Sequence, residues 1–235
     1  MKPNFIELPG CGPIPILFED RSVLAVDKPR GWMLVPHSWQ KTQRNLQAAI
    51  TSSIAAGDFW ARSRGLKFLR HVHRLDADTS GILLFAKSSG AVEVISDLFE
   101  SRRMEKTYLA VVSGESKQKE WVCSLKLAPD ERRIGKMRVN ARLGKAAETH
   151  FKLLETRGKS SLIECKPITG RTHQIRVHLA ECALPIIGDE LYGKPEGNLP
   201  LALRAVGLAF LNPFTKRRVD IRATIEEFLK EFGFE

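Results

Sequence analysis

The segment HVHRLDADTSGILLFAK, residues 71–87, decides the fold of this 235-residue chain. Its apolar run, Ile82–Ala86, shows no alternation of polar and apolar residues, which predicts a strand covered on both faces at the centre of a sheet. The preceding Thr79–Gly81 favours a turn. Asp76 lies just before this turn, where a rigid strand holds a loop carboxylate in place, as a catalytic group requires. On the turn alone, the simpler interpretation is that Asp76 only accepts hydrogen bonds from nearby amides.

Composition predicts a soluble, cytoplasmic globular protein. The hydrophobic share of 43% is ordinary for a globular domain, and the length allows one good-sized domain with a substantial core. No apolar run approaches the roughly 18 residues that span a bilayer. The first residues lack the apolar centre of a signal peptide. We therefore expect no membrane partner.

The sequence gives no positive sign of a metal or cofactor. Its four cysteines, Cys11, Cys123, Cys165 and Cys182, form no close pair in the sequence, which favours reduced thiols over a zinc site or disulfide framework. His71 and His73 alternate as a ligand pair might on a strand, but no second ligand cluster accompanies them. No phosphate-binding glycine motif occurs either. We expect neither a metal nor a cofactor.

The chain is basic, and the excess is concentrated in one segment. A net charge of +10 favours a polyanionic partner, although many basic proteins bind none. We call residues 126–145 the basic segment. It contains seven basic residues: Lys126, Arg132, Arg133, Lys136, Arg138, Arg142 and Lys145. Gly135 and Gly144 interrupt it, which predicts an extended loop that either is simply solvated or grips a nucleic-acid backbone.

Local patterns predict most of the remaining elements. We expect two helices capped by Asn45 and Ser88, because these residues precede amphipathic stretches. Strands are predicted at residues 14–18, 22–26, 106–112, 151–154 and 161–165. A further helix is predicted at residues 172–183, with Arg176 beside its apolar face. Periodicity alone favours a surface salt bridge for Arg176, and it favours a core position for Tyr108.

Several motifs together resemble the RluA-type pseudouridine synthases. His73-Arg74-Leu75-Asp76, followed by Thr79-Ser80-Gly81, is similar to the signature of that family. Three further stretches match in the expected order: KPRGW at 28–32, KTY at 106–108, and TGRTHQIRVHLA at 169–180 with GDELYG at 188–193. The resemblance extends from about Ile16 to Pro213.

This resemblance implies a fold and a function. The implied fold is α+β: a large, mixed but mostly antiparallel sheet, bent, with flanking helices and a central cleft. The catalytic domain would occupy residues 13–235 after an N-terminal extension of residues 1–12, which is the short form of the family without an additional RNA-binding domain. The implied activity is isomerisation of specific uridines in tRNA or ribosomal RNA to pseudouridine, without a cofactor. A monomer is the simplest expectation for the oligomeric state.

The resemblance also assigns roles to individual residues. Asp76 would be the catalytic residue. Arg176 would pair with it and keep its carboxylate ionised at neutral pH, and the ring of Tyr108 would pack on the target base. His173 and His178 are expected to be structural hydrogen-bonding residues.

Three basic residues are predicted to bind the RNA. Arg74 would occupy the space left when the target base swings out of its stack. Arg171, just before the predicted helix, is placed to hold a phosphate at the positive end of that helix. Lys145 would contact the RNA strand from the basic segment.

One departure from the family pattern and two alternative functions remain. Arg204 stands where the family usually has histidine, which puts any role of that histidine in doubt. A non-catalytic RNA-binding or ribosome-assembly protein of the same fold is the main alternative, although Asp76, Tyr108 and Arg176 are all present. A hydrolase using Asp76 with His73 or His173 is the second alternative, but no G-x-S-x-G motif accompanies them.

Overall fold

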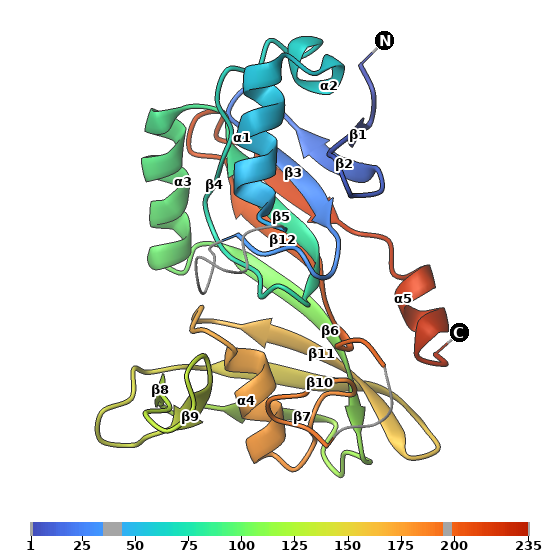
Figure 1. The fold of residues 1–235 in the computed structure, drawn as a ribbon. Helices are drawn as coiled ribbons and strands as arrows, with labels where there is room; N and C mark the ends of the chain where they lie inside the picture. Colours follow the sequence, from blue (N-terminus) through green and yellow to red (C-terminus); the bar gives the residue numbers. More distant parts are fainter. Residues whose placement is uncertain (1, 35–43, 195–198, 235) are drawn as a thin grey trace. The chain divides into compact units, whose positions relative to one another are not determined.

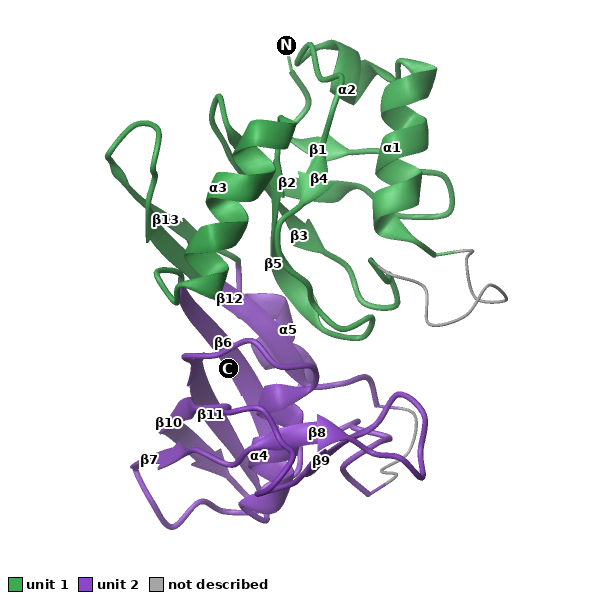
Figure 2. Ribbon diagram, turned by 90° about the vertical axis from the view of Figure 1, so that its left-hand side faces the viewer, with its two compact units in different colours: residues 1–104, 207–223 green, residues 105–206, 224–235 purple. Residues whose placement is uncertain are grey.

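The computed structural model describes residues 2–34, 44–194 and 199–234, and the chain divides into two compact units. Unit 1 comprises Met1–Met104 and Gly207–Ala223, and unit 2 comprises Glu105–Val206 and Thr224–Glu235 (Figure 2). Strand β12 (Leu203–Leu211) therefore contributes residues to both units. The domain predicted for residues 13–235 includes parts of each.

Unit 1 contains the first part of the sheet. Its strands are β1 (Phe5–Ile6), β2 (Ile14–Glu19), β3 (Val23–Lys28), β4 (Arg70–His71), β5 (Ser80–Ala86) and β13 (Arg218–Arg222). They are ordered β1-β2-β3-β5-β12, with β13 beside β12 and β4 beside β5. The pairs β1–β2, β2–β3, β3–β5, β4–β5 and β12–β13 are antiparallel, which confirms the predicted first hairpin. Within the predicted N-terminal extension, Ile6 and Leu8 are buried in this unit.

Strand β5 is buried along its whole length, as its unbroken apolar run predicts. Ile82 and Leu84 point to the face covered by α3 (Ser89–Glu100) and join one buried cluster with it. Leu83 and Phe85 point to the opposite face, because side chains alternate along a strand, and they are fully buried there. Helix α1 (Leu46–Ala56) lies on that side of the sheet (Figure 1). Each such side chain contributes about 1.5–3 kcal/mol through burial.

The helices of unit 1 begin where the sequence predicts. The Asn45 side chain accepts a hydrogen bond from the Ala48 amide at 3.0 Å, and the Ser88 hydroxyl accepts one from the Ala91 amide at 3.2 Å. Gly57, at φ +72°, ends α1 in the left-handed conformation that glycine adopts readily. A short helix, α2 (Phe59–Arg62), follows α1.

Unit 2 contains β6 (Glu105–Ser113), β7 (Glu120–Cys123), β10 (Thr149–Arg157) and β11 (Ser160–Pro167). Their order is β12-β6-β11-β10-β7, and the β6–β11, β11–β10 and β10–β7 pairs are antiparallel. Helices α4 (Gln174–Glu181) and α5 (Glu226–Glu231) pack into the same buried cluster through Ile175, Leu179 and Phe228. Within the described part of the chain, no helix is long and apolar enough to cross a membrane.

The basic segment is more ordered than predicted. Instead of a wholly extended loop, it contains the two-stranded antiparallel sheet of β8 (Leu127–Pro129) and β9 (Met137–Val139). Backbone hydrogen bonds between Leu127 and Lys145 join the start of the segment to its end. Its short strands were missed because their residues show too little alternation to be distinguished from a loop.

Candidate active site

The Asp76 loop enters the buried strand β5 directly, as predicted. Asp76 is half-buried, and its backbone carbonyl accepts a hydrogen bond from the Thr79 amide at 3.2 Å, closing a turn. Thr79 and Ser80 are buried at the start of the strand. A carboxylate in this position is carried by a short turn whose far end is fixed in the core of unit 1.

Lys28 holds the same loop through hydrogen bonds to its backbone. This side chain is fully buried, and its ammonium donates hydrogen bonds to the carbonyls of Pro29, Ala77 and Thr79 at 2.8–2.9 Å. Burial lowers the pKa of Lys28 to about 8, while the carboxylates of Asp78 and Asp76 act in the opposite direction. Lys28 therefore ties the turn from Asp76 to Thr79 to the end of β3. Sequence reasoning assigned it no such role, although it lies in the KPRGW match.

His73 supports the strand next to this loop. Its Nε2 atom accepts a hydrogen bond from the Leu84 amide at 3.0 Å, and its ring stacks on Phe99 with centroids 4.5 Å apart. Because that lone pair is already engaged, His73 is poorly suited to act as the base of the hydrolase alternative. Arg74, the next residue, is exposed, as a residue that contacts a substrate must be.

In unit 2, Arg176 is buried rather than on the surface, so the surface salt bridge favoured by periodicity is wrong. Its Nε and Nη2 atoms donate to Oδ2 and Oδ1 of Asp189, both at 2.8 Å, and both side chains are almost completely shielded from solvent. The ring of Tyr192 lies 5.3 Å from the guanidinium carbon. Asp189 and Tyr192 fall within the GDELYG match but were given no role. The predicted pairing of Arg176 with Asp76 joins residues of different units and stays a prediction.

The predicted Tyr108 lies on β6, two residues after Lys106, which is half-buried. The Lys106 ammonium donates to the Thr169 carbonyl at 3.0 Å, and burial lowers its pKa to about 8. Tyr108 is half-buried, packs against the core of unit 2, and pairs with Cys165 of β11. Lys106 thus links the strand that carries Tyr108 to the turn before α4.

Gln174 organises that turn. Its side-chain oxygen accepts hydrogen bonds from the Thr169 hydroxyl at 2.6 Å and the Arg171 amide at 3.0 Å, and its amide group donates to the Glu148 carbonyl. The Arg171 side chain donates to the Ala146 carbonyl at 3.0 Å. The backbone amide of Arg171 is therefore engaged within the protein, which limits its predicted phosphate contact to the side chain.

The two histidines of this region form structural hydrogen bonds, as expected. His173 precedes α4 in a left-handed conformation, φ +54°, so the predicted helix begins two residues later than Thr172. Its Nδ1 atom is 2.9 Å from the Tyr192 hydroxyl. His178 is buried, donates to the Leu125 carbonyl at 3.1 Å and contacts the Thr149 hydroxyl at 3.0 Å. Burial lowers the pKa of His178.

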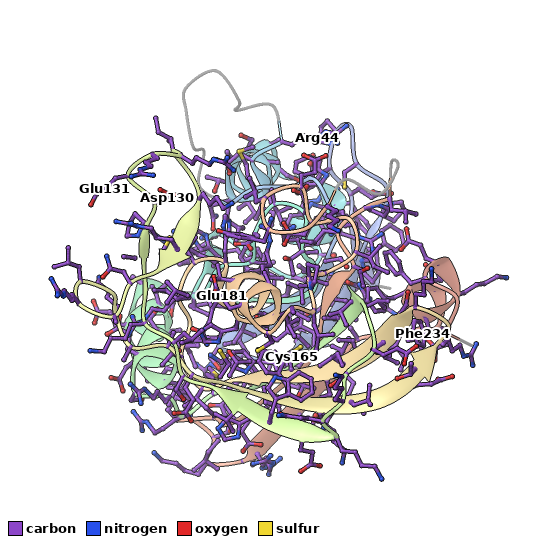
Figure 3. The ribbon with its side chains drawn as sticks, turned by 90° about the horizontal axis from the view of Figure 1, so that it is seen from below. Arg44, Asp130, Glu131, Cys165, Glu181 and Phe234 are labelled. Atoms are coloured by element: carbon purple, nitrogen blue, oxygen red, sulfur yellow. The ribbon has the colours of Figure 1, made fainter. Side chains whose placement is uncertain are left out.

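The basic segment presents most of its cations to solvent. Lys126, Arg132, Arg133, Arg138, Arg142 and Lys145 are exposed. The acidic residues Asp130 and Glu131 lie on the connection between β8 and β9 (Figure 3), and Glu131 approaches Arg138 only to 3.8 Å. The Met137 amide donates to the Tyr192 hydroxyl at 2.7 Å, which attaches the segment to the body of unit 2.

The described residues contain no group of three or more His, Cys, Asp or Glu side chains that could hold a metal ion. All four cysteines are free. Arg204 is buried, and its Nε atom donates to the Thr224 carbonyl at 3.0 Å.

Comparison with known proteins is consistent across sequence and structure. Residues 22–181 match the RNA pseudouridylate synthase family. The chain is 37% identical over 180 residues to mouse pseudouridylate synthase RPUSD2, covering 77% of this chain and 30% of that protein. It is 35% identical over 194 residues to ribosomal large subunit pseudouridine synthase D of Borreliella burgdorferi, covering 81% of this chain and 58% of that protein. The chain thus spans less than two thirds of these relatives.

A solved structure gives the same result. Human RNA pseudouridylate synthase domain containing 1 superposes with a TM-score of 0.71 at 26% identity, over 90% of this chain and 83% of that one. This likeness confirms the predicted α+β pseudouridine synthase fold, and the sequence matches confirm the predicted RluA-type relationship. The chain belongs to the RNA pseudouridylate synthase family.

Proposed function

We propose that this chain is an RNA pseudouridine synthase in which Asp76 is the catalytic residue. The observation that carries the proposal is the way in which the turn carrying Asp76 is held in place. In a chain of this family, the signature aspartate lies on a turn that runs into a fully buried strand, and a buried lysine holds that turn through two backbone carbonyls. A turn fixed in this way keeps the carboxylate of Asp76 in one place, which the chemical step requires.

The reaction needs no external reactant. The bond from the ribose to the uracil nitrogen breaks, the uracil turns, and a new bond forms from the same ribose carbon to carbon 5 of the ring. Carbon 5 releases its proton and the freed nitrogen takes one up, so the product is an isomer of the substrate. Asp76 starts the reaction either by attacking the sugar or the ring, or by removing a sugar proton.

Arg176 and Tyr108 are proposed as the partners of Asp76. A guanidinium beside the carboxylate favours its ionised form, which either starting step needs. The Tyr108 ring is proposed to pack on the extruded base. Swinging a base out of its stack costs a few kcal/mol, and the exposed Arg74 is proposed to offset this by occupying the vacated space.

The basic segment is proposed as the main grip on the RNA backbone, in tRNA or ribosomal RNA. Support comes from its exposed cations, including Lys145, and from its attachment to unit 2 through Tyr192. Arg171, whose side chain lies beside Ala146 at the end of the segment, extends the same grip. Phosphate contacts of this kind give affinity without sequence information.

The test uses purified protein and RNA labelled with tritium at carbon 5 of uridine. Wild-type protein should release tritium, and Asp76→Asn should release none while binding RNA with unchanged affinity. The matched control is Asp78→Asn, the same change at an exposed carboxylate two residues further along the loop. Wild-type release by Asp76→Asn would refute the assignment, and no release by wild-type protein from any tRNA or ribosomal RNA would refute the activity.

A further inference from the structure

Two residues outside the proposed catalytic set determine how Arg176 is held. Asp189 binds one edge of the guanidinium, formed by Nε and Nη2, and the guanidinium carbon lies over the Tyr192 ring, 5.3 Å from its centre. We propose that Asp189 and Tyr192 are positioning residues that fix the orientation in which Arg176 serves the catalytic aspartate. This inference rests on the proposed function.

Two contacts hold the guanidinium of Arg176. A bidentate contact sets the rotation of the guanidinium within its plane, because two parallel hydrogen bonds must both be satisfied. The guanidinium carbon also lies over the face of the Tyr192 ring, where a cation–π attraction favours its position. The remaining nitrogen, Nη1, then points in a direction set by the protein rather than by the flexible side chain. An arginine side chain has many rotamers, so restricting it beforehand removes an entropy loss that would otherwise accompany catalysis.

Asp189 is itself held firmly. Its Oδ1 atom accepts hydrogen bonds from the amides of Leu191 and Tyr192 at 3.0 and 3.1 Å, in addition to Arg176. The side chain is 1% exposed. The position of Arg176 is therefore determined by the backbone turn at residues 189–192, and not by a mobile surface carboxylate.

Tyr192 is fixed by the elements on either side of it. Its hydroxyl accepts a hydrogen bond from the Met137 amide at 2.7 Å and lies 2.9 Å from Nδ1 of His173. The Lys136 ammonium lies 5.1 Å from the centre of the same ring. The ring that covers Arg176 is thus anchored both to the basic segment and to the start of α4.

A simpler interpretation is that Asp189 and Arg176 form a buried ion pair that only stabilises unit 2. Asp189→Asn separates the two interpretations. Asparagine can keep the Oδ1 contacts to the Leu191 and Tyr192 amides, but it places an NH2 group opposite the Nε–H of Arg176. The matched control is Asp220→Asn, because Asp220 makes a bidentate contact with Arg222 that is exposed to solvent.

The first measurement does not depend on activity. Nitrogen-15 NMR of the full chain reports the Nε–H of Arg176, assigned by its loss in Arg176→Lys. We expect a slowly exchanging, ordered signal in wild-type protein and in Asp220→Asn, and a shifted, rapidly exchanging signal in Asp189→Asn. An equally ordered Arg176 signal in Asp189→Asn would overturn the proposal. This result holds even if the wild-type protein proves inactive on RNA, an outcome that would refute only the proposed function.

The second measurement separates kcat from KM. A loosened Arg176 misplaces a group that acts in the chemical step, so Asp189→Asn should lower kcat about tenfold to a hundredfold. RNA affinity should stay within about threefold, because Asp189 is buried and touches no RNA. An unchanged kcat in folded Asp189→Asn protein would overturn the proposal.

Should Asp189→Asn not fold, Tyr192 supplies the same test. Tyr192→Leu removes the ring over the guanidinium, whereas Tyr192→Phe keeps the ring and removes only the hydroxyl contacts. The value of kcat should fall further in Tyr192→Leu than in Tyr192→Phe. Equal kcat values in the two variants would show that the ring does not orient Arg176.

Discussion

Burial of Lys28 should make the stability of this protein depend on pH in a predictable direction. The folded protein holds Lys28 at a pKa of about 8, below the ordinary value of 10.5, because burial disfavours the ammonium. Between these values the unfolded chain binds more protons than the folded one, so stability rises with pH. The gain from pH 7 to pH 10 is about 2–3 kcal/mol, from roughly 1.4 kcal/mol per unit of pKa shift and the partial titration at each end.

The variant that isolates this effect is Lys28→Met, which removes the titrating group and keeps a long apolar stem. It leaves the Ala77 carbonyl hydrogen-bonded to the Gly31 amide, but the contacts from Lys28 to the Pro29 and Thr79 carbonyls are lost. Losing those contacts costs about 1–3 kcal/mol each, and relief from burying a charge offsets part of that cost near pH 7. At neutral pH, the cost of the lost hydrogen bonds and the relief from burying a charge therefore partly cancel. As the pH rises, the relief becomes smaller and the cost of the lost hydrogen bonds dominates.

Urea unfolding of both proteins at pH 7, 8, 9 and 10 provides the assay. Other groups titrate in this range: burial raises the pKa of Cys165 and, together with nearby Cys182, raises that of Cys123 to about 11. These thiols lower stability as pH rises, but they do so equally in both proteins. The stability of wild type relative to Lys28→Met should grow by about 2–3 kcal/mol between pH 7 and pH 10. Parallel profiles would refute the reasoning.

Three further outcomes follow from burial, backbone conformation and charge. Gly188→Ala should destabilise the protein by several kcal/mol. About 1–2 kcal/mol comes from placing alanine in the left-handed conformation, because φ is +73° at this position, and the rest comes from a clash of the added Cβ with the Pro200 carbonyl oxygen, 2.1 Å away. Gly57→Ala, at φ +72° with open space around it, should show only the conformational part in the same urea titration. The neutral, buried His178 should make stability fall as the pH drops below its ordinary value of 6.5, because the unfolded chain takes up a proton first; an equally steep acid-side loss in His178→Gln would contradict this. Replacing the exposed Arg132 and Arg133 by alanine should reduce the salt dependence of RNA binding by a slope of about 1–2, and an unchanged slope would exclude these residues from the RNA contact.

Elements set by local sequence were predicted well. The unbroken apolar run of Ile82–Ala86 is buried on both faces, and Asn45 and Ser88 cap the helices that follow them. Each of these features depends on residues that lie within a few positions of one another. Their periodicity and capping chemistry are therefore visible in the sequence.

The supporting contacts of the site could not be predicted in the same way. Lys28 is 49 residues from Ala77, whose carbonyl it binds, and Arg176 is 13 residues from Asp189. Partners at such separations depend on how strands and turns pack, which no local pattern reports. Periodicity also misplaced Arg176 on the surface, because a buried arginine is uncommon and requires a partner that the pattern does not reveal. The family motifs brought these residues to attention without giving their contacts.

A map of pseudouridine in total RNA, at single-base resolution, tests the central claim most directly. Cells that lack this gene should lose pseudouridine at one or a few positions in tRNA or ribosomal RNA. Wild-type protein should restore those positions, and Asp76→Asn, expressed at the same level, should not. Restoration by Asp76→Asn would contradict the role of the aspartate, and an unchanged map in the cells that lack the gene would contradict the activity itself.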